Sequence, residues 1–205
     1  MMNPFQLILK EKWVTVSVIG SIFTFTFIDS FRKGILNPII DVILPDRVFS
    51  HLNIKVNIKQ VGSDRIANAI SIIDNKKNYI IVDFGTATTF DIIEKNYYVG
   101  GIIAPGVNLS LETLITKASL IPYIKLNKIS DVIGKNTKSA VRSGFYWGYI
   151  GLINEIINLI KKKTKKKYSI ILTGGLSYLF KNKLKSNVIV NKDLTMKGLL
   201  KVVNN

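Results

Sequence analysis

The sequence predicts an α/β protein in which helices pack on a mixed β-sheet. Three apolar, β-branched runs follow one another closely at residues 79–84, 88–93 and 97–103. After them, stretches with helical spacing alternate with two further apolar runs, at 168–175 and 187–190. Three successive strands followed by alternating helices and strands are typical of a mixed sheet with helices packed on it.

Length and composition limit the possible classes of protein. The chain has 205 residues and is 47% hydrophobic, which is enough for one large domain or two small ones with a buried core. It has no cysteine, which excludes disulfides, thiolate metal sites and a cysteine nucleophile and agrees with a cytoplasmic location. His51 is the only histidine, which argues against a histidine-based triad or a multi-histidine metal site.

The charge balance is strongly basic, with 29 Lys and Arg against 13 Asp and Glu, a net charge of +16. Most of the excess is lysine spread over the whole chain, which indicates a general surface bias. The one cluster, Lys161–Lys167, lies at the end of a predicted helix, where cations suit the helix dipole. We therefore expect no nucleic-acid partner, with a basic RNA-binding surface as the alternative.

The first part of the chain predicts two strands and two helices before a polar break at 74–78. The uncharged stretch 13–28 is shorter than the ~20 residues that span a bilayer, so we expect a buried strand and no membrane segment. The expected elements are a strand at 13–19, a helix at 24–37, a short strand at 41–44 and a helix in 62–74. In this last helix Ser63 would cap the first turn, while Ile66, Ile70 and Ile73 recur on one face.

The second part begins with the three strands, which should form an antiparallel meander because only the short loop Glu94–Tyr97 joins the last two. A helix follows Pro105, and a long helix covers about 137–163. Its predicted buried face consists of Val141, Phe145, Tyr149, Leu152, Ile156 and Ile160. A strand, a short helix, a short strand and a terminal helix complete the chain.

A carboxylate and a small turn separate the first two strands of the meander. Asp83 ends the first strand, and Gly85 allows a tight turn in which Thr86 and its neighbours offer amides and hydroxyls to an anion. A carboxylate beside a phosphate turn makes sense if it holds a cation. The alternative is an ordinary β-hairpin with an Asx-type hydrogen bond.

Further glycines follow strands elsewhere in the second part. Gly100, Gly101 and Gly106 lie around the third strand, and Gly174 and Gly175 end the strand at 168–175. Glycine at these places lets a base or sugar approach the backbone closely. Each is weak evidence alone, but together they predict a nucleotide cleft.

The segment VGSDRIANAI, residues 61–70, supplies a candidate for acid-base chemistry. Asp64 and Arg65 lie at a helix N-terminus, where free amides favour an ionised carboxylate that can accept a proton. The alternative is that Asp64 is a first-turn partner of the helix dipole and that Arg65 is a surface cation.

Five motifs together resemble one known family. VGSDRIANAI, DFGTATTFDI, GGIIAPGVNLSLETL, VIGKNTKSAVRSGFYWGYIGLI and TGG, in this order and at about this spacing, closely resemble type III pantothenate kinase, also called the Bvg accessory factor family. The resemblance runs from about Val14 to the C-terminus.

The resemblance implies a duplicated fold of the acetate and sugar kinase/Hsp70/actin type, which is ribonuclease H-like, with ATP between two related halves. Residues 1–76 would be a partial N-terminal half carrying the Gly-Ser-Asp-Arg motif, and 77–205 the C-terminal half with nucleotide and cation motifs. The implied reaction is ATP-dependent phosphorylation of pantothenate, the first step of coenzyme A synthesis. The implied protein is a cytoplasmic homodimer that uses Mg²⁺ with its ATP.

The matched motifs also imply roles for individual residues. Pantothenate would contact Thr137 and the four motif residues Gly62, Ser63, Asp64 and Arg65, with Asp64 as the general base. Thr86, Gly174 and Gly175 would contact the nucleotide. Asp83 would bind a monovalent cation, K⁺ or NH₄⁺.

The sequence also departs from the family pattern. Members begin with a strand, an Asp-x-Gly-Asn-Thr phosphate turn and a returning strand, and nothing of that kind appears here. The stretch VSVIGSIFT, residues 16–24, fits better on a later strand of the family, with Gly20 where proline is usual. A tyrosine expected shortly before the Gly-x-Asp-Arg motif is not evident near Lys55 and Val56. We therefore expect these 205 residues alone to show little kinase activity, because phosphoryl transfer depends on phosphate positioning. The alternative function is a non-catalytic remnant or a regulatory pantothenate-binding protein.

Overall fold

The computed structural model describes residues 52–203, which belong to one compact unit, Asp46–Asn205. The strands expected at 13–19 and 41–44 and the helix at 24–37 lie outside the described residues. The predicted division into halves at residues 76 and 77 stays a prediction.

A six-stranded mixed sheet forms the centre of the described part, with the order β1-β4-β3-β2-β5-β6. The strands are β1 (Asn53–Ile54), β2 (Asn78–Phe84), β3 (Ala87–Glu94), β4 (Tyr97–Pro105), β5 (Ser169–Gly174) and β6 (Val188–Val190). As predicted, β2, β3 and β4 form an antiparallel meander. The other three pair in parallel: β1 with β4, β5 with β2, and β6 with β5. The α/β class and the mixed sheet are confirmed.

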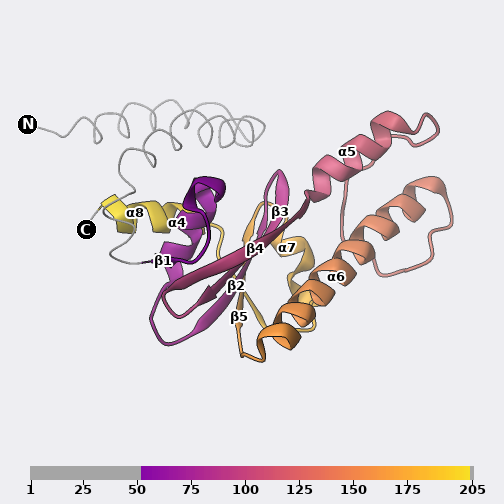
Figure 1. Ribbon diagram of the computed structural model, residues 1–205. Coiled ribbons are helices and arrows are strands. Elements are labelled where there is room, and N and C mark those ends of the chain that lie inside the picture. The colour runs from indigo at the N-terminus through magenta and orange to yellow at the C-terminus, as the bar shows by residue number, and fades with distance from the viewer. Residues whose placement is uncertain (1–51, 204–205) are drawn as a thin grey trace, which may run out of the picture. The chain divides into compact units, whose positions relative to one another are not determined.

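Helices cover both faces of this sheet (Figure 1). One face carries α4 (Ser63–Ile72) and α8 (Leu194–Val203), which pack against each other. The other carries α6 (Thr137–Thr164), with α5 (Val107–Lys117) and α7 (Ser177–Phe180). Two 3₁₀ turns, η2 (Ile58–Gln60) and η3 (Lys181–Lys183), complete the described elements. Within residues 52–203, every helix is too short or too polar to cross a membrane.

The main apolar core lies between the sheet and α6. Alternate residues of β2 and β3, among them Ile80, Val82 and Phe90, point to this side because side chains alternate along a strand. The predicted buried face of α6 is wrong, because the buried apolar side chains lie on the neighbouring face of the helix. The buried apolar residues of α6 are Tyr146, Ile150, Ile153, Ile157 and Ile160, and of the predicted set only Ile160 is among them. The others are half-buried, because the apolar stripe is wide and its centre is set by the sheet.

The start of α4 differs from the expectation in one respect. Ser63 is the first helical residue, Gly62 holds the N-cap position, and the helix has no side-chain cap hydrogen bond, so the predicted Ser63 cap is wrong. A Cβ at Gly62 would lie 2.7 Å from the Asp64 Oδ1 atom, so a side chain there would displace the Asp64 carboxylate. Ile66 and Ile70 are buried as predicted.

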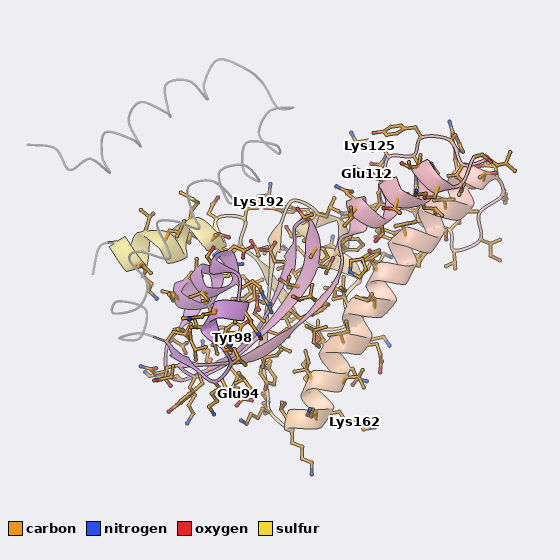
Figure 2. The ribbon with its side chains drawn as sticks, turned by 45° about the horizontal axis from the view of Figure 1, so that its top comes forward. Glu94, Tyr98, Glu112, Lys125, Lys162 and Lys192 are labelled. Atoms are coloured by element: carbon orange, nitrogen blue, oxygen red, sulfur yellow. The ribbon has the colours of Figure 1, made fainter. Side chains whose placement is uncertain are left out.

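Beyond the sheet, α5, the first turns of α6 and the segment 118–136 that joins them extend as an arm (Figure 1). Figure 2 labels Glu112 and Lys125 on this arm, well away from Tyr98 in the sheet. The residues that join the two helices include four exposed apolar side chains: Leu120, Tyr123, Val132 and Ile133.

Candidate functional site

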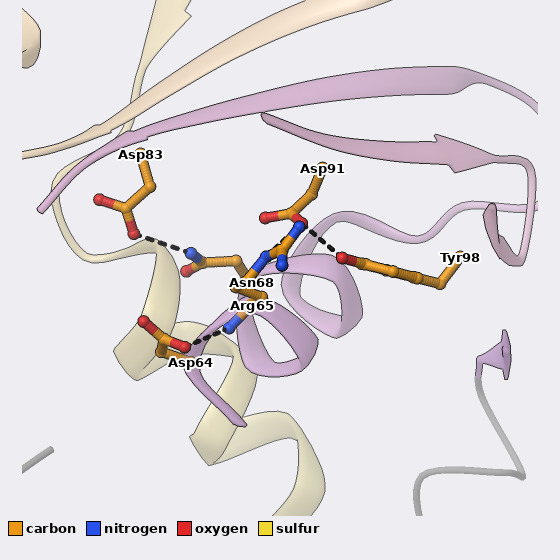
Figure 3. A network of polar contacts seen from close by, with 6 residues as sticks. All are labelled: Asp64, Arg65, Asn68, Asp83, Asp91 and Tyr98. Carbon is orange, nitrogen blue, oxygen red and sulfur yellow. Dashed lines mark hydrogen bonds and ion pairs between the residues drawn. The ribbon is translucent and has the colours of Figure 1, made fainter. Parts of the chain in front are cut away.

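Polar side chains gather on the sheet face that α4 covers (Figure 3). Asp83 on β2 lies opposite Thr89 on β3, and Asp91 is two residues further along β3, so both carboxylates point to this face. From α4, Arg65 reaches Asp91 and Asn68 reaches Asp83. The two aspartates of the DFGTATTFDI motif are therefore both anchored to the helix that carries Asp64.

Arg65 and Asp91 form a buried ion pair. The Asp91 Oδ1 atom lies 2.7 Å from Nε and 2.6 Å from Nη2 of Arg65, and the side chains are 0% and 11% exposed respectively. The Tyr98 hydroxyl donates a hydrogen bond of 2.5 Å to the same oxygen. The alternative that Arg65 is a surface cation is wrong, because the sheet supplies it with a buried carboxylate.

Glycine is required at position 101 by the close approach of this guanidinium. Gly101 on β4 pairs with Asp91 on β3. A Cβ at Gly101 would lie 2.0 Å from Arg65 Nη2 and 2.5 Å from the Phe90 carbonyl oxygen. The predicted close approach at this glycine is therefore made by an arginine of the chain itself.

Burial and the ion pair together set the pKa values of both groups. Burial raises the pKa of Asp91 to about 6, and this rise is opposed by the positive charge of Arg65 and by hydrogen bonds from Arg65 and Tyr98. For Arg65, burial lowers the pKa, but the Asp91 carboxylate outweighs that effect and the net shift is upward. At neutral pH Asp91 is ionised and paired with a charged Arg65.

This raised pKa predicts a pH dependence of stability. Between the ordinary value of 3.8 and about 6, the folded chain binds more protons at Asp91 than the unfolded chain does. The contribution of Asp91 to the free energy of unfolding therefore falls as the pH rises through this window. Arg65, Tyr98 and Asp83 are the charged or titratable groups that act on this carboxylate.

The check is urea unfolding of the natural sequence and of Asp91→Asn between pH 4 and pH 7. We expect the free energy of unfolding of the natural sequence, minus that of Asp91→Asn, to fall as the pH rises. Asp74 and Glu94, whose pKa values are lowered, contribute the opposite slope in both proteins and cancel. A difference that stays flat or rises with pH would contradict the assignment.

A second chain of hydrogen bonds links α8, α4 and β2. The Thr195 hydroxyl donates to the Asn68 Oδ1 atom at 2.7 Å, and the Asn68 amide donates to the Asp83 Oδ2 atom at 3.1 Å. Asn68 is fully buried, and α8 comes so close to α4 that a Cβ at Gly198 would lie 1.8 Å from the Ala67 carbonyl oxygen. Asp83 is thus held by Asn68 of α4, and Asn68 is itself held by Thr195 of α8, 127 residues further along the chain.

Gly174 lies next to Asp83. The parallel pairing of β2 and β5 puts Thr173 opposite Asp83, and Gly174 follows with a positive φ of 83°. A Cβ at Gly174 would lie 2.6 Å from Asp83 Oδ1 and 2.5 Å from the Phe84 carbonyl oxygen, so glycine is needed for both reasons. Gly175 is exposed in the turn that leads to α7. The structure therefore brings Asp83, the predicted cation ligand, close to Gly174 and Gly175, the predicted nucleotide contacts, at the carboxyl ends of the neighbouring strands β2 and β5.

The remaining predicted residues lie at the ends of their elements. Asp64 is half-buried at the start of α4, and its Oδ1 atom accepts a hydrogen bond of 2.9 Å from the Arg65 backbone amide. Thr86 is exposed in the turn between β2 and β3, and its carbonyl oxygen lies where a Cβ of Gly106 would be. Thr137 is exposed at the start of α6, on the opposite side of the sheet from α4 (Figure 1). The structure does not bring Thr137 to Asp64 within one chain.

Sequence reasoning missed Asn68, Asp91, Tyr98 and Thr195. A signal existed for the first two. Asn68 follows Asp64 by four residues, so it shares that face of the helix. Asp91 follows Thr89 by two residues, so it shares that face of the strand. For Tyr98 and Thr195, local spacing carries no such signal.

The mixed sheet with helices on both faces is of the class shared by sugar kinases, Hsp70 and actin, and Asp83 at the end of β2, beside the Thr86 turn, suits a phosphoryl-transfer enzyme. The chain belongs to the type III pantothenate kinase family, whose model matches residues 5–159.

Similar proteins agree with this assignment. The chain is 65% identical over 150 residues to a type III pantothenate kinase of Pelagibacter ubique, covering 73% of this chain and 60% of the relative. It is 48% identical over 141 residues to one of Ruegeria pomeroyi, covering 68% of this chain and 54% of the relative. The chain thus spans little more than half the length of these relatives.

Solved structures also match the fold. One of them is that of a Campylobacter jejuni protein described as a Baf family transcriptional activator, with a TM-score of 0.53 and 22% identity. The match covers 77% of this chain and 70% of that one.

Proposed function

We propose that the protein carrying this sequence transfers the γ-phosphoryl group of ATP to the primary hydroxyl of pantothenate, which gives 4′-phosphopantothenate and ADP at the start of coenzyme A synthesis. Family membership supports this reaction. One geometric observation connects the proposed reaction to Asp64 and Asp83. Asp64 and Asn68 are one helical turn apart on α4, and Asn68 donates to Asp83, so the expected base and the expected cation ligand share one side of the sheet.

In this proposal Asp64 is the general base. It removes the proton of the substrate hydroxyl while the hydroxyl oxygen attacks the γ-phosphorus atom and ADP leaves. It lies half-buried at the start of α4, beside the helix amides. Gly62, Ser63 and Arg65 would contact pantothenate, and Thr86, Gly174 and Gly175 the nucleotide, with Mg²⁺ accompanying ATP.

A monovalent cation at Asp83 fits the oxygen atoms around it. Asp83 lies between Thr89 on β3 and Thr173 on β5, so three oxygen-bearing side chains from neighbouring strands share one face. The Thr89 hydroxyl oxygen is buried and has no hydrogen-bond partner among the described residues. An oxygen-lined site of this kind suits K⁺ or NH₄⁺, which would offset the phosphate charge beside the carboxylate.

We expect K⁺ to stabilise the protein through Asp83. Replacing NaCl by KCl at equal ionic strength, with K⁺ about ten times above its Kd, should raise the melting temperature by about 3 °C. Asp83→Ala should abolish this difference, and turnover should lose its dependence on K⁺. Asp74→Ala, an exposed aspartate in the segment before β2, is the matched control and should keep this difference. A K⁺ response that survives Asp83→Ala would remove Asp83 from the role.

The place of Thr137 supports a homodimer. Thr137 starts α6 on the opposite side of the sheet from α4, so Thr137 and Asp64 of one chain do not reach the same substrate. Two copies could bring them together if the arm of one chain lay against α4 of the other. The exposed Leu120, Tyr123 and Ile133 on that arm are apolar surface suited to such an interface.

The reaction would take place in the cytoplasm, in agreement with a chain of 205 residues without cysteine.

Calorimetry and a coupled ADP-release assay together test the function. Pantothenate should bind in the presence of K⁺, and ADP release should depend on pantothenate when the chain is fused behind the N-terminal segment of the Pelagibacter relative. Binding without turnover in both the chain and the fusion would favour the alternative, a non-catalytic pantothenate-binding protein. Absence of both binding and turnover would reject the proposal.

A further inference from the structure

Asp91 is a fully buried carboxylate to which the proposed reaction gives no role. One of its oxygens, Oδ1, accepts a hydrogen bond from Arg65 Nε at 2.7 Å and another from Tyr98 at 2.5 Å. The same oxygen lies 2.6 Å from Arg65 Nη2 in the ion pair. The other oxygen is buried and has no hydrogen-bond partner among the described residues. The Asp91 carboxylate is thus directed at Arg65, the residue next to the proposed base.

The surroundings of this carboxylate are closely packed. Asp91 and Tyr98 lie on the adjacent antiparallel strands β3 and β4, and Gly101 leaves the space into which the guanidinium fits. A guanidinium presents its donors in one plane, so fixing the edge formed by Nε and Nη2 fixes the direction of its remaining donors. Without these partners the arginine would have to be ordered each time that it met a ligand.

We propose that Asp91 and Tyr98 are positioning residues that hold the Arg65 guanidinium in one orientation beside Asp64 and thereby raise the affinity for pantothenate. This inference rests on the proposed function for its substrate. The holding of Arg65 itself is a property of the chain and can be measured without substrate. Tyr98 acts through Asp91: its hydroxyl keeps the carboxylate turned so that Oδ1 faces both nitrogens.

Arginine side-chain NMR gives the substrate-free readout. The sequence has only four arginines, Arg32, Arg47, Arg65 and Arg142, so the Nε–H signal of Arg65 can be assigned with Arg65→Lys. A buried hydrogen bond to a carboxylate should make this signal exchange slowly with water. Tyr98→Phe should speed the exchange by about 10-fold, and Asp91→Asn should remove the slow signal.

Tyr79→Phe is the matched control. The Tyr79 hydroxyl donates to the Asp74 carboxylate at 2.7 Å, at the far end of β2, so this variant loses the same kind of hydrogen bond away from Arg65. Calorimetry on the same proteins should show the pantothenate Kd rising by about 3- to 10-fold in Tyr98→Phe, with the control unchanged. The melting temperatures of the two variants show whether any loss of affinity is only a loss of stability.

The inference is overturned if Tyr98→Phe and Tyr79→Phe have the same Arg65 exchange rate, or if Tyr98→Phe speeds exchange but leaves the pantothenate Kd unchanged. If Asp91→Asn does not fold, Tyr98→Phe decides. A third outcome separates this inference from the proposed function. If the chain binds no pantothenate, the proposed substrate is rejected. If its Arg65 signal is nevertheless slow and Tyr98→Phe loses that signal, the holding of Arg65 is supported.

Discussion

Replacing Asp64 by asparagine is expected to lower kcat by about 100-fold or more while the affinity for ATP stays nearly unchanged. The amide keeps the shape of the side chain, and its oxygen can still accept the hydrogen bond from the Arg65 backbone amide. What it loses is the ability to take a proton from the substrate hydroxyl. The measurement is steady-state kinetics with pantothenate and ATP, run on the fusion that carries the Pelagibacter N-terminal segment.

The control is Asp74→Asn, an exposed aspartate that also accepts hydrogen bonds from backbone amides, those of Lys76 and Lys77. It should leave kcat within about twofold of the natural sequence, because the loss of an exposed hydrogen bond has no part in the chemical step. A kcat for Asp64→Asn that matches this control would remove Asp64 as the base. An equal loss of ATP affinity would instead point to a damaged nucleotide site.

Arg65→Met is expected to reduce the free energy of unfolding by about 3–5 kcal/mol at neutral pH. The substitution preserves much of the length of the side chain but leaves the fully buried Asp91 carboxylate without its cation. Urea unfolding measures the loss. Arg65 holds the pKa of Asp91 down to about 6, so its removal raises that pKa further. The loss should therefore shrink as the pH falls toward about 6, because Asp91 takes up a proton in the variant before it does so in the natural sequence.

Two further variants separate the buried charge from other effects. Adding Asp91→Asn to Arg65→Met should regain more than half of the lost stability at neutral pH, because no uncompensated charge is then buried. Lys166→Met breaks a surface ion pair with Glu94, in which Lys166 is 47% exposed, and should cost less than about 1 kcal/mol. A cost for Arg65→Met no larger than that of Lys166→Met would contradict a buried ion pair.

Local patterns were enough to predict most of the fold. The β-branched runs and the short loop Glu94–Tyr97 located β2, β3 and β4, because strand alternation and hairpin length are properties of neighbouring residues. The predicted long helix at 137–163 matches α6 at Thr137–Thr164. The predicted buried face of α6 is displaced to the neighbouring face of the helix. Apolar residues occupy both of these faces, and only the packing of α6 against the sheet decides which one is buried.

The site was predicted in part for the same reason. Asp64 and Asp83 each stand at the end of an element, where a turn or a helix start makes a carboxylate noticeable in the sequence. Arg65 could not be distinguished from a surface cation, because its partner Asp91 is 26 residues away. The contact of Thr195 with Asn68 spans 127 residues and depends on how α8 packs on α4, which no local spacing reports.

The proposed reaction is tested most directly by ³¹P NMR of ATP and pantothenate incubated with the fusion protein, Mg²⁺ and K⁺. The expected result is the loss of the ATP γ-phosphate signal with equal amounts of ADP and one new phosphomonoester, 4′-phosphopantothenate. The new signal should be absent without pantothenate and at least 100-fold slower to form in Asp64→Asn. ATP that stays intact, or that yields only inorganic phosphate whether or not pantothenate is present, would contradict the assignment.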